Sequence, residues 1–200
     1  MVKERLKSPR ARLFVALDLP GEIREGIDAW GSEALRDPAL RRVAPESLHV
    51  TLAFLGFRAE KEIDRIAELV GESVGPAPWV ELLEPVARPP RGRARLYALS
   101  ALSPGTEALQ AALQANLVEA GLYEPEKRAF WPHVTVARVR PKSRGSRRPA
   151  MVSEPPGDLP QALKDPFVGV RMTLYRSELQ PQGARYAPLA QVELPGAGQQ

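Results

Sequence analysis

The chain contains two histidines, and each begins the same tripeptide, His49-Val50-Thr51 and His133-Val134-Thr135. Valine and threonine are ordinary residues, so chance would place the same pair after the second histidine roughly once in a few hundred trials. The match extends into the flanking residues at a constant offset of 84. The repetition indicates that the protein needs two copies of a histidine–threonine pair.

Two imidazoles and two hydroxyls can do acid–base chemistry on a phosphate. Histidine takes or gives a proton near neutral pH, since its ordinary pKa is about 6.5. In the hydrolysis of a cyclic phosphodiester, one imidazole can deprotonate water while the other protonates the leaving ribose oxygen. The threonine hydroxyls can bind the phosphoryl oxygens, whose charge grows in the transition state. This scheme uses no metal, and two histidines without Cys or an acidic partner motif are a poor metal site.

Strand geometry would put these groups on one surface. Side chains alternate along a strand, so His49 and Thr51 share one face, as do His133 and Thr135. We expect the four groups to line one concave surface between two lobes. A single His-Val-Thr-Val segment would usually be ordinary strand sequence with a structural histidine. Two copies that hold every histidine of the chain favour the catalytic interpretation.

Apolar periodicity predicts two strand–helix–strand units, each of which ends in a motif. The distance from the first apolar strand to the histidine is 36 residues in the first unit and 37 in the second. The strand over 95–99 echoes the one over 12–16, and we expect Gly56 to end the first motif strand. The expected elements are strands over 12–17, 47–55, 79–86, 95–99 and 132–139, and helices over about 23–35, 59–73 and 103–121.

The remaining residues predict a long loop and two final strands. Residues 140–163 are rich in Pro, Gly, Ser and Arg, and a loop of that length is usually functional or disordered. Strands over 167–179 and 184–194 are joined by a turn at 180–183, and residues 196–200 are predicted to fray. We expect one bilobal catalytic domain over 1–200. Its lobes are 12–88 and 94–164, and the strands of 167–194 complete the sheets.

Composition narrows the class of protein. The chain has no cysteine, which excludes disulfides, a thiol nucleophile and Cys-ligated metal sites. No apolar run suits a signal peptide or a membrane span, so we expect a soluble cytoplasmic protein. The net charge is +4, and 22 of the 28 basic residues are arginine, the side chain suited to forked contacts with phosphate.

The motifs and the segments around them resemble the two-histidine phosphoesterases, most closely the RNA 2′,3′-cyclic phosphodiesterases once named 2′-5′ RNA ligases. The resemblance implies an α+β fold, with two pseudo-symmetric lobes of antiparallel sheet and outer helices around a central cleft. It also implies that His49, Thr51, His133 and Thr135 are catalytic. The first histidine would be the acid to the ribose 3′ oxygen and the second the base to water, leaving a 2′-phosphate. The matching segments are 12–17, 49–56, 130–138, 174–179 and 183–186.

Arg138 matches a family arginine that contacts the phosphate. Strict alternation from His133 would turn Arg138 to the opposite face, so a bulge, a twist or a long reach is required. The aromatic residues near the motifs are candidates to stack on a base, with a place in the core as the alternative: Phe54, Tyr97, Phe130 and Trp131. Relatives often carry tryptophan near the position of Tyr97.

Two basic segments could extend the substrate site. The first, 88–95, leads into the second lobe, and the second, 140–148, directly follows the second motif strand. In the second segment, Arg144, Arg147 and Arg148 are candidates to hold an RNA backbone. A solvated or disordered charged loop is the alternative.

We therefore expect a metal-independent enzyme that opens 2′,3′-cyclic phosphates at RNA ends, without cofactor or membrane association. Its substrates would include tRNA fragments, and it would act as a monomer. The alternatives are 2′-5′ RNA ligation, opening of another cyclic nucleotide phosphate, and binding of RNA ends without catalysis. Two complete His-x-Thr pairs argue against binding without catalysis, since a protein that only binds RNA ends has no need of both pairs.

Overall fold

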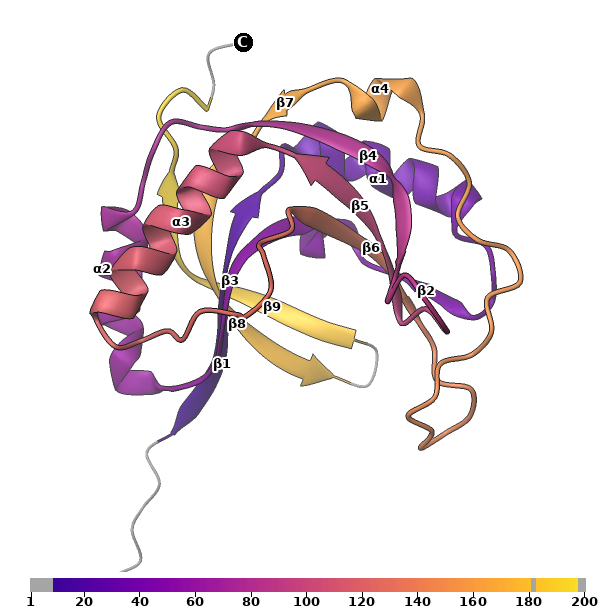
Figure 1. Ribbon diagram of the computed structural model, residues 1–200, viewed down its shortest axis with the longest axis horizontal. Coiled ribbons are helices and arrows are strands. Elements are labelled where there is room, and N and C mark those ends of the chain that lie inside the picture. The colour runs from indigo at the N-terminus through magenta and orange to yellow at the C-terminus, as the bar shows by residue number, and fades with distance from the viewer. Residues whose placement is uncertain (1–8, 181–182, 198–200) are drawn as a thin grey trace, which may run out of the picture.

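The strands form one antiparallel sheet in the computed structural model, which describes residues 9–180 and 183–197 (Figure 1). Within these ranges the strand order is β7-β4-β5-β6-β3-β1-β8-β9, and β2 pairs with β6. The sheet curls, and this confirms the predicted α+β class. The strands are β1 (Arg10–Asp18), β2 (Leu40–Arg42), β3 (His49–Ala59), β4 (Trp79–Arg88), β5 (Leu96–Leu102), β6 (His133–Val139), β7 (Phe167–Val168), β8 (Arg171–Gln180) and β9 (Gly183–Glu193).

The longer helices cover the sheet with apolar faces. In α3, Leu109, Leu113 and Leu117 recur at helical spacing and are buried, each stabilising the fold by about 1.5–3 kcal/mol. Ser103 caps this helix by accepting a hydrogen bond from the backbone N–H of Thr106. The helices are α1 (Gly21–Ala34), α2 (Ile63–Glu72), α3 (Pro104–Glu119) and α4 (Gln161–Lys164), with 3₁₀ turns η1 (Pro45–Ser47) and η2 (Glu60–Glu62). None of the described helices is long and apolar enough to cross a membrane.

The two motif strands are neighbours at the centre of the sheet. β3 and β6 run antiparallel, and Val50 pairs with Val134. This register sets His49 opposite Thr135 and Thr51 opposite His133, because side chains directly across an antiparallel pair share a face. A pseudo-two-fold axis between the two valines therefore relates the motifs.

Three features differ from the sequence-based expectation. β3 continues through Gly56, because this glycine adopts a φ of +67°, which lets the strand bulge instead of ending. The expected strand over 167–179 is interrupted at Gly169, where a Cβ would come within 2.7 Å of the Leu17 side chain. The short strand β2 and helix α4 were not predicted, because such short segments hold too few residues for a periodic pattern. Of the expected 180–183 turn, residues 181–182 lie outside the described part of the chain.

Candidate active site

Both histidines are held in the same way at one ring nitrogen. The Nδ1 atom of His49 lies 2.8 Å from the carbonyl oxygen of Ser47, and the Nδ1 atom of His133 lies 2.8 Å from that of Trp131. A carbonyl can only accept a hydrogen bond, so each Nδ1 carries a proton and donates it. In each ring, Nε2 is then the nitrogen that can exchange a proton with a substrate.

The four motif side chains lie together on one face of the central strands. In the first motif, the Nε2 of His49 is 3.1 Å from the hydroxyl oxygen of Thr51. His49, Thr51, His133 and Thr135 are all half-buried, whereas Val50 and Val134 are fully buried on the opposite face. The alternation predicted from the sequence is thus present in both strands.

Each motif is followed by the same irregularity in strand pairing. Thr51 pairs with Ala16 and Ala53 pairs with Val15, which leaves Leu52 without a partner on β1. In the second lobe, Thr135 pairs with Ala98 and Ala137 pairs with Tyr97, which leaves Val136 as the extra residue. A residue inserted in this way is a β-bulge, and it shifts the alternation of the residues that follow by one.

The bulges bring Phe54 and Arg138 onto the face of the histidines. At each bulge the inserted residue and the one after it are both buried, and the following residue is exposed. Phe54 is 51% exposed, and its ring centroid lies 5.9 Å from that of Phe14, which itself stacks on His49. The two residues occupy equivalent positions, so the first lobe offers an aromatic ring where the second offers a cation.

Tyr97 does not reach this face. It pairs with Ala137 on the core side of the sheet and is only 8% exposed. Ala16 of β1 pairs with the threonine of the first motif, and Ala98 of β5 pairs with that of the second. Equivalent residues of β1 and β5 are therefore 82 positions apart in the sequence. The sequence echo suggested 83, which wrongly matched Tyr97 to Phe14. The structural counterpart of Tyr97 is Val15, a core residue.

Aromatic rings surround His49. Phe14 stacks on its imidazole at 5.0 Å, and Tyr186 approaches edge-on at 5.5 Å. Tyr175 lies 6.2 Å away and stacks on Phe14. Little in the sequence indicates this group, because Tyr175 and Tyr186 come from the two final strands, more than 120 residues after His49.

A buried carboxylate lies beside this aromatic group. Asp18 pairs with His49 across β1 and β3 and is 5% exposed. Its oxygens accept hydrogen bonds of 2.8–2.9 Å from Arg171, Thr173 and Tyr175, all on β8. Buried charges need partners of this kind, and Asp18 has three. A lone aspartate at the end of an apolar strand was the only signal in the sequence.

Burial lowers the pKa of His49 from 6.5 to about 4. The hydrogen bond to the Ser47 carbonyl and the charge of Asp18 oppose this change, whereas the positive forms of His133 and Arg138 add to it. In the protein without substrate, His49 is therefore neutral at physiological pH. The negative charge of a bound phosphate would favour its protonated form.

His133 lies in a more positive environment. Burial lowers its pKa, and the nearby charges of Arg88 and Arg138 lower it further, against the hydrogen bond to the Trp131 carbonyl. Across β5, the partner of His133 is Ser100, where His49 has Asp18. The difference between the two imidazoles is therefore a carboxylate, Asp18, that acts on His49 alone, whereas the cation Arg138 acts on both.

The pH dependence of any acid–base reaction at this site should reflect these shifts. Because kcat/KM reports the free protein, we expect its bell-shaped profile at lower pH than two ordinary histidines would give. The profile of kcat should lie at higher pH, because bound phosphate favours the imidazolium form. Rate measurements from about pH 4 to 9 would test this, and coincident profiles centred above the ordinary histidine pKa of about 6.5 would contradict it.

The long segment after β6 is tied to the rest of the molecule. The carboxylate of Asp37, only 3% exposed, accepts hydrogen bonds from the backbone of Ser153 and Glu154. These and other bonds lower the pKa of Asp37 to about 2. Further along, the Trp30 indole donates to the Asp158 carbonyl at 2.9 Å. Residues 151–159 are therefore anchored.

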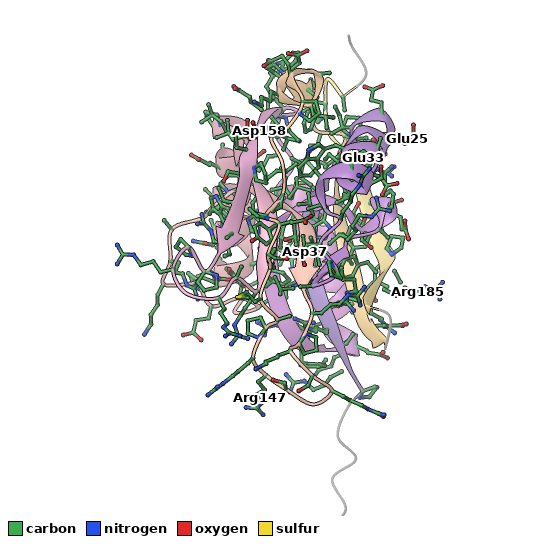
Figure 2. The ribbon with its side chains drawn as sticks, turned by 90° about the vertical axis from the view of Figure 1, so that its right-hand side faces the viewer. Glu25, Glu33, Asp37, Arg147, Asp158 and Arg185 are labelled. Carbon is green, nitrogen blue, oxygen red and sulfur yellow. The ribbon has the colours of Figure 1, made fainter. Side chains whose placement is uncertain are left out.

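The preceding residues, 140–150, form an exposed basic loop. Pro141 and Pro149 form a β-bridge at its base, and Arg93 from the β4–β5 turn donates to the Pro149 carbonyl at 3.4 Å. Arg144, Arg147 and Arg148 are exposed. Figure 2 shows Arg147 on the outer loop, while Asp37 lies nearer the middle of the molecule. The two basic segments predicted from the sequence therefore meet at one end of the sheet.

Paired histidines and threonines on a curled antiparallel sheet define the two-histidine phosphoesterase class. No cluster of three or more metal-binding side chains occurs among the described residues. Residues 19–159 match the 2′-5′ RNA ligase superfamily, and the chain belongs to this family.

Relatives and solved structures agree with this membership. The RNA 2′,3′-cyclic phosphodiesterase of Escherichia coli K12 is 31% identical over 89% of this chain and 93% of its own length. That of Methanothermobacter thermautotrophicus is 30% identical over 90% of this chain and 97% of its own length. A crystal structure from Thermus thermophilus has a TM-score of 0.74 at 30% identity, covering 92% of this chain and 98% of its own. E. coli LigT complexed with 3′-AMP has a TM-score of 0.70 at 27% identity, covering 93% and 99%.

Proposed function

We propose that this protein hydrolyses 2′,3′-cyclic phosphate ends of RNA to 2′-phosphomonoesters, with His49 and His133 as acid and base. The observation that carries the proposal is the matched hydrogen bonding of the two imidazoles. Each donates from Nδ1 to a backbone carbonyl and keeps Nε2 for proton exchange, on the face that also holds two threonines. Relatives that share about 30% of the sequence over most of the chain carry this activity in their names.

The neighbouring charges favour His49 as the acid. An acid must carry its proton when the reaction begins, and burial leaves His49 with a pKa of about 4, so the bound phosphate must first favour its protonated form. The Asp18 carboxylate then favours the imidazolium form of His49, and among the described residues His133 has no such carboxylate. The base must be unprotonated, and the cations Arg88 and Arg138 favour the neutral form of His133. His133 would take a proton from water while His49 gives one to the ribose 3′ oxygen.

The threonines and Arg138 would bind the phosphate itself. Their donors stand on the face of the histidines, so they can stabilise the charge that grows on the non-bridging oxygens. No step requires a metal ion. Phe54 would stack on the terminal base from the equivalent position in the first lobe. E. coli LigT was solved in complex with 3′-AMP, which supports the binding of a nucleotide by this chain.

Turnover of a cyclic-phosphate-ended oligonucleotide in EDTA tests this proposal. We expect full activity in the chelator, equal to that with added magnesium. A protein that binds the oligonucleotide without converting it, or that needs a divalent ion restored, would overturn the proposal.

Ligation is a second candidate, and the family description favours it. A 5′-hydroxyl of another RNA can take the place of water at the same phosphate, with the same two histidines exchanging protons. Adding a 5′-hydroxyl oligonucleotide to the assay and looking for a 2′-5′ joined product would detect this reaction.

Longer RNA, including tRNA fragments, would be held by Arg144, Arg147 and Arg148. The segments 85–95 and 140–150 contain nine basic residues and no acidic one, so they can bind a phosphate backbone without repulsion.

We further infer that the chain has two lobes, 12–88 and 94–164, and that the protein is cytoplasmic. We infer a monomer, since one chain supplies both motifs.

Replacing Arg144, Arg147 and Arg148 together by glutamine should weaken oligonucleotide binding but leave a mononucleotide cyclic phosphate unaffected. The slope of log affinity against log salt should flatten by about 0.7 for each phosphate that the loop no longer neutralises. The measurement is kcat/KM for both substrates at several salt concentrations. Equal losses on both substrates would mean that the loop supports the site structurally.

A further inference from the structure

Trp131 contacts His133 through both its backbone and its side chain. Its carbonyl oxygen accepts the Nδ1–H of His133 at 2.8 Å. Its indole ring stacks on the imidazole with a centroid distance of 4.0 Å and an interplanar angle of 11°. The bond fixes one edge of the imidazole and the stack fixes one face, so the ring has little freedom to turn.

The indole is itself held from two directions. Its Nε1–H donates to the Ser100 hydroxyl at 3.3 Å, and Ser100 is the β5 partner of His133. On the indole, the guanidinium carbon of Arg88 lies 3.8 Å from the ring centroid. Cations bind aromatic faces at this distance, and a tryptophan face binds them best. Arg88, Trp131 and His133 therefore form a continuous stack from β4 to β6.

The stack fixes a positive charge beside the imidazole. Among the described residues, the charged groups that act on His133 are Arg88 from β4 and Arg138 from β6. His49, on the neighbouring strand β3, is the other titratable group near it. The two arginines repel an imidazolium at His133, and His49 would do so only in its protonated form.

Among the described residues, the rings that stack at His49 are Phe14 and then Tyr175, and neither is in a cation–π contact like that of Arg88 with Trp131. In the first lobe a phenylalanine, Phe14, packs on the imidazole, and the charged group on the pairing strand is the Asp18 carboxylate. Arg88 and Trp131 thus break the symmetry of the two motifs.

We propose that Trp131 and Arg88 are positioning residues for His133, which orient its imidazole and hold a cation near it so that it serves as the proton-accepting base. Trp131 supplies the orientation through its carbonyl and its indole. Arg88 supplies the charge, and the indole keeps the guanidinium in place. The role of His133 as the base rests on the proposed function. The effect of Trp131 and Arg88 on the imidazole does not, because it can be tested without substrate.

Proton NMR titration of the imidazoles tests the stack directly. The chain has two histidines, so two sets of ring signals are expected, and His49→Ala assigns them. Arg88→Met should move the titration midpoint of His133 to higher pH and leave that of His49 nearly unchanged. Arg88→Lys should keep the His133 midpoint near that of the unmodified protein. Arg65→Met, which removes the same charge from the outer helix α2, is the matched control and should move neither midpoint.

Rates on a mononucleotide 2′,3′-cyclic phosphate provide the second readout. Arg88→Met should lower kcat/KM roughly three- to tenfold on the acidic side of its optimum and much less on the alkaline side. Trp131→Leu should lower kcat at all pH values, and Trp131→Phe should recover most of it because a ring still stacks on the imidazole.

An unchanged His133 midpoint in Arg88→Met would overturn the proposal. So would a loss confined to KM, since that would make Arg88 a substrate contact. If the unmodified protein did not hydrolyse cyclic phosphates while the midpoint still moved, the proposed function would fail and the stack would stand.

Discussion

Replacing either His49 or His133 by alanine is expected to lower kcat for a 2′,3′-cyclic phosphate by about 10²- to 10⁴-fold. The reason is that each substitution would remove one of the two groups that we propose to move protons in the same step, and general acid–base catalysis contributes about this factor. The double variant should be little worse than either single one, because groups that act as a unit do not contribute additively. Steady-state rates are the measurement, with circular dichroism to verify the fold. Near-normal turnover by either variant would contradict the paired mechanism.

A substrate with a better leaving group separates the two roles. A phosphodiester of p-nitrophenol needs no proton on its leaving oxygen, because p-nitrophenolate is stable near neutral pH. If His49 is the acid, His49→Ala should recover most of its activity on this substrate, whereas His133→Ala should remain inactive. Recovery by His133→Ala instead would reverse the assignment drawn from the charges of Asp18 and Arg88.

Arg138→Ala is expected to have the next largest effect, about 10²-fold in kcat/KM, or roughly 2–3 kcal/mol. The bulge at Val136 turns the Arg138 side chain to the face of the histidines, where it can bind the phosphoryl oxygens. A mononucleotide substrate carries the reacting phosphate, so its kcat/KM should fall by as much as that of an oligonucleotide. Kinetic constants for both substrates are the measurement.

Two variants control for the charge itself. Arg138→Lys keeps the charge but loses the forked geometry of the guanidinium. Its kcat/KM should lie between that of Arg138→Ala and that of the unmodified protein. Arg65→Ala removes a positive charge on α2 and should have no effect on the rate. A loss for Arg138→Ala that appears only with oligonucleotides would place Arg138 with the RNA backbone and away from the reacting phosphate.

The sequence was sufficient to predict the parts of this molecule that follow local periodicity. Alternation in His-Val-Thr predicted which side chains share a face, and helical spacing predicted the leucine face of α3. The order of the elements followed as well, because each longer strand and helix carries its own apolar pattern. The repeated His-x-Thr pairs indicated the proposed catalytic groups, and the family resemblance implied the same four residues.

What the sequence could not predict depends on register between distant strands. Whether Arg138 reaches the site depends on a bulge at Val136, and the bulge depends on how β5 pairs with β6. Tyr97 was a candidate to stack on a base because it is an aromatic residue on a strand near the second motif, but the register of β5 with β6 places it in the core. The contacts of Asp18 with β8 join residues more than 150 positions apart, so no local pattern indicates them.

The position of the product phosphate tests the central claim most directly. An oligonucleotide ending in a 2′,3′-cyclic phosphate is incubated with the protein in EDTA and isotopically labelled water, and the product is identified by phosphorus NMR and mass spectrometry. We predict a single 2′-phosphomonoester that carries one labelled oxygen, because water activated by one histidine attacks phosphorus while the other protonates the 3′ oxygen. A 3′-phosphate, a mixture of isomers, or conversion only after a divalent ion is restored would contradict the account.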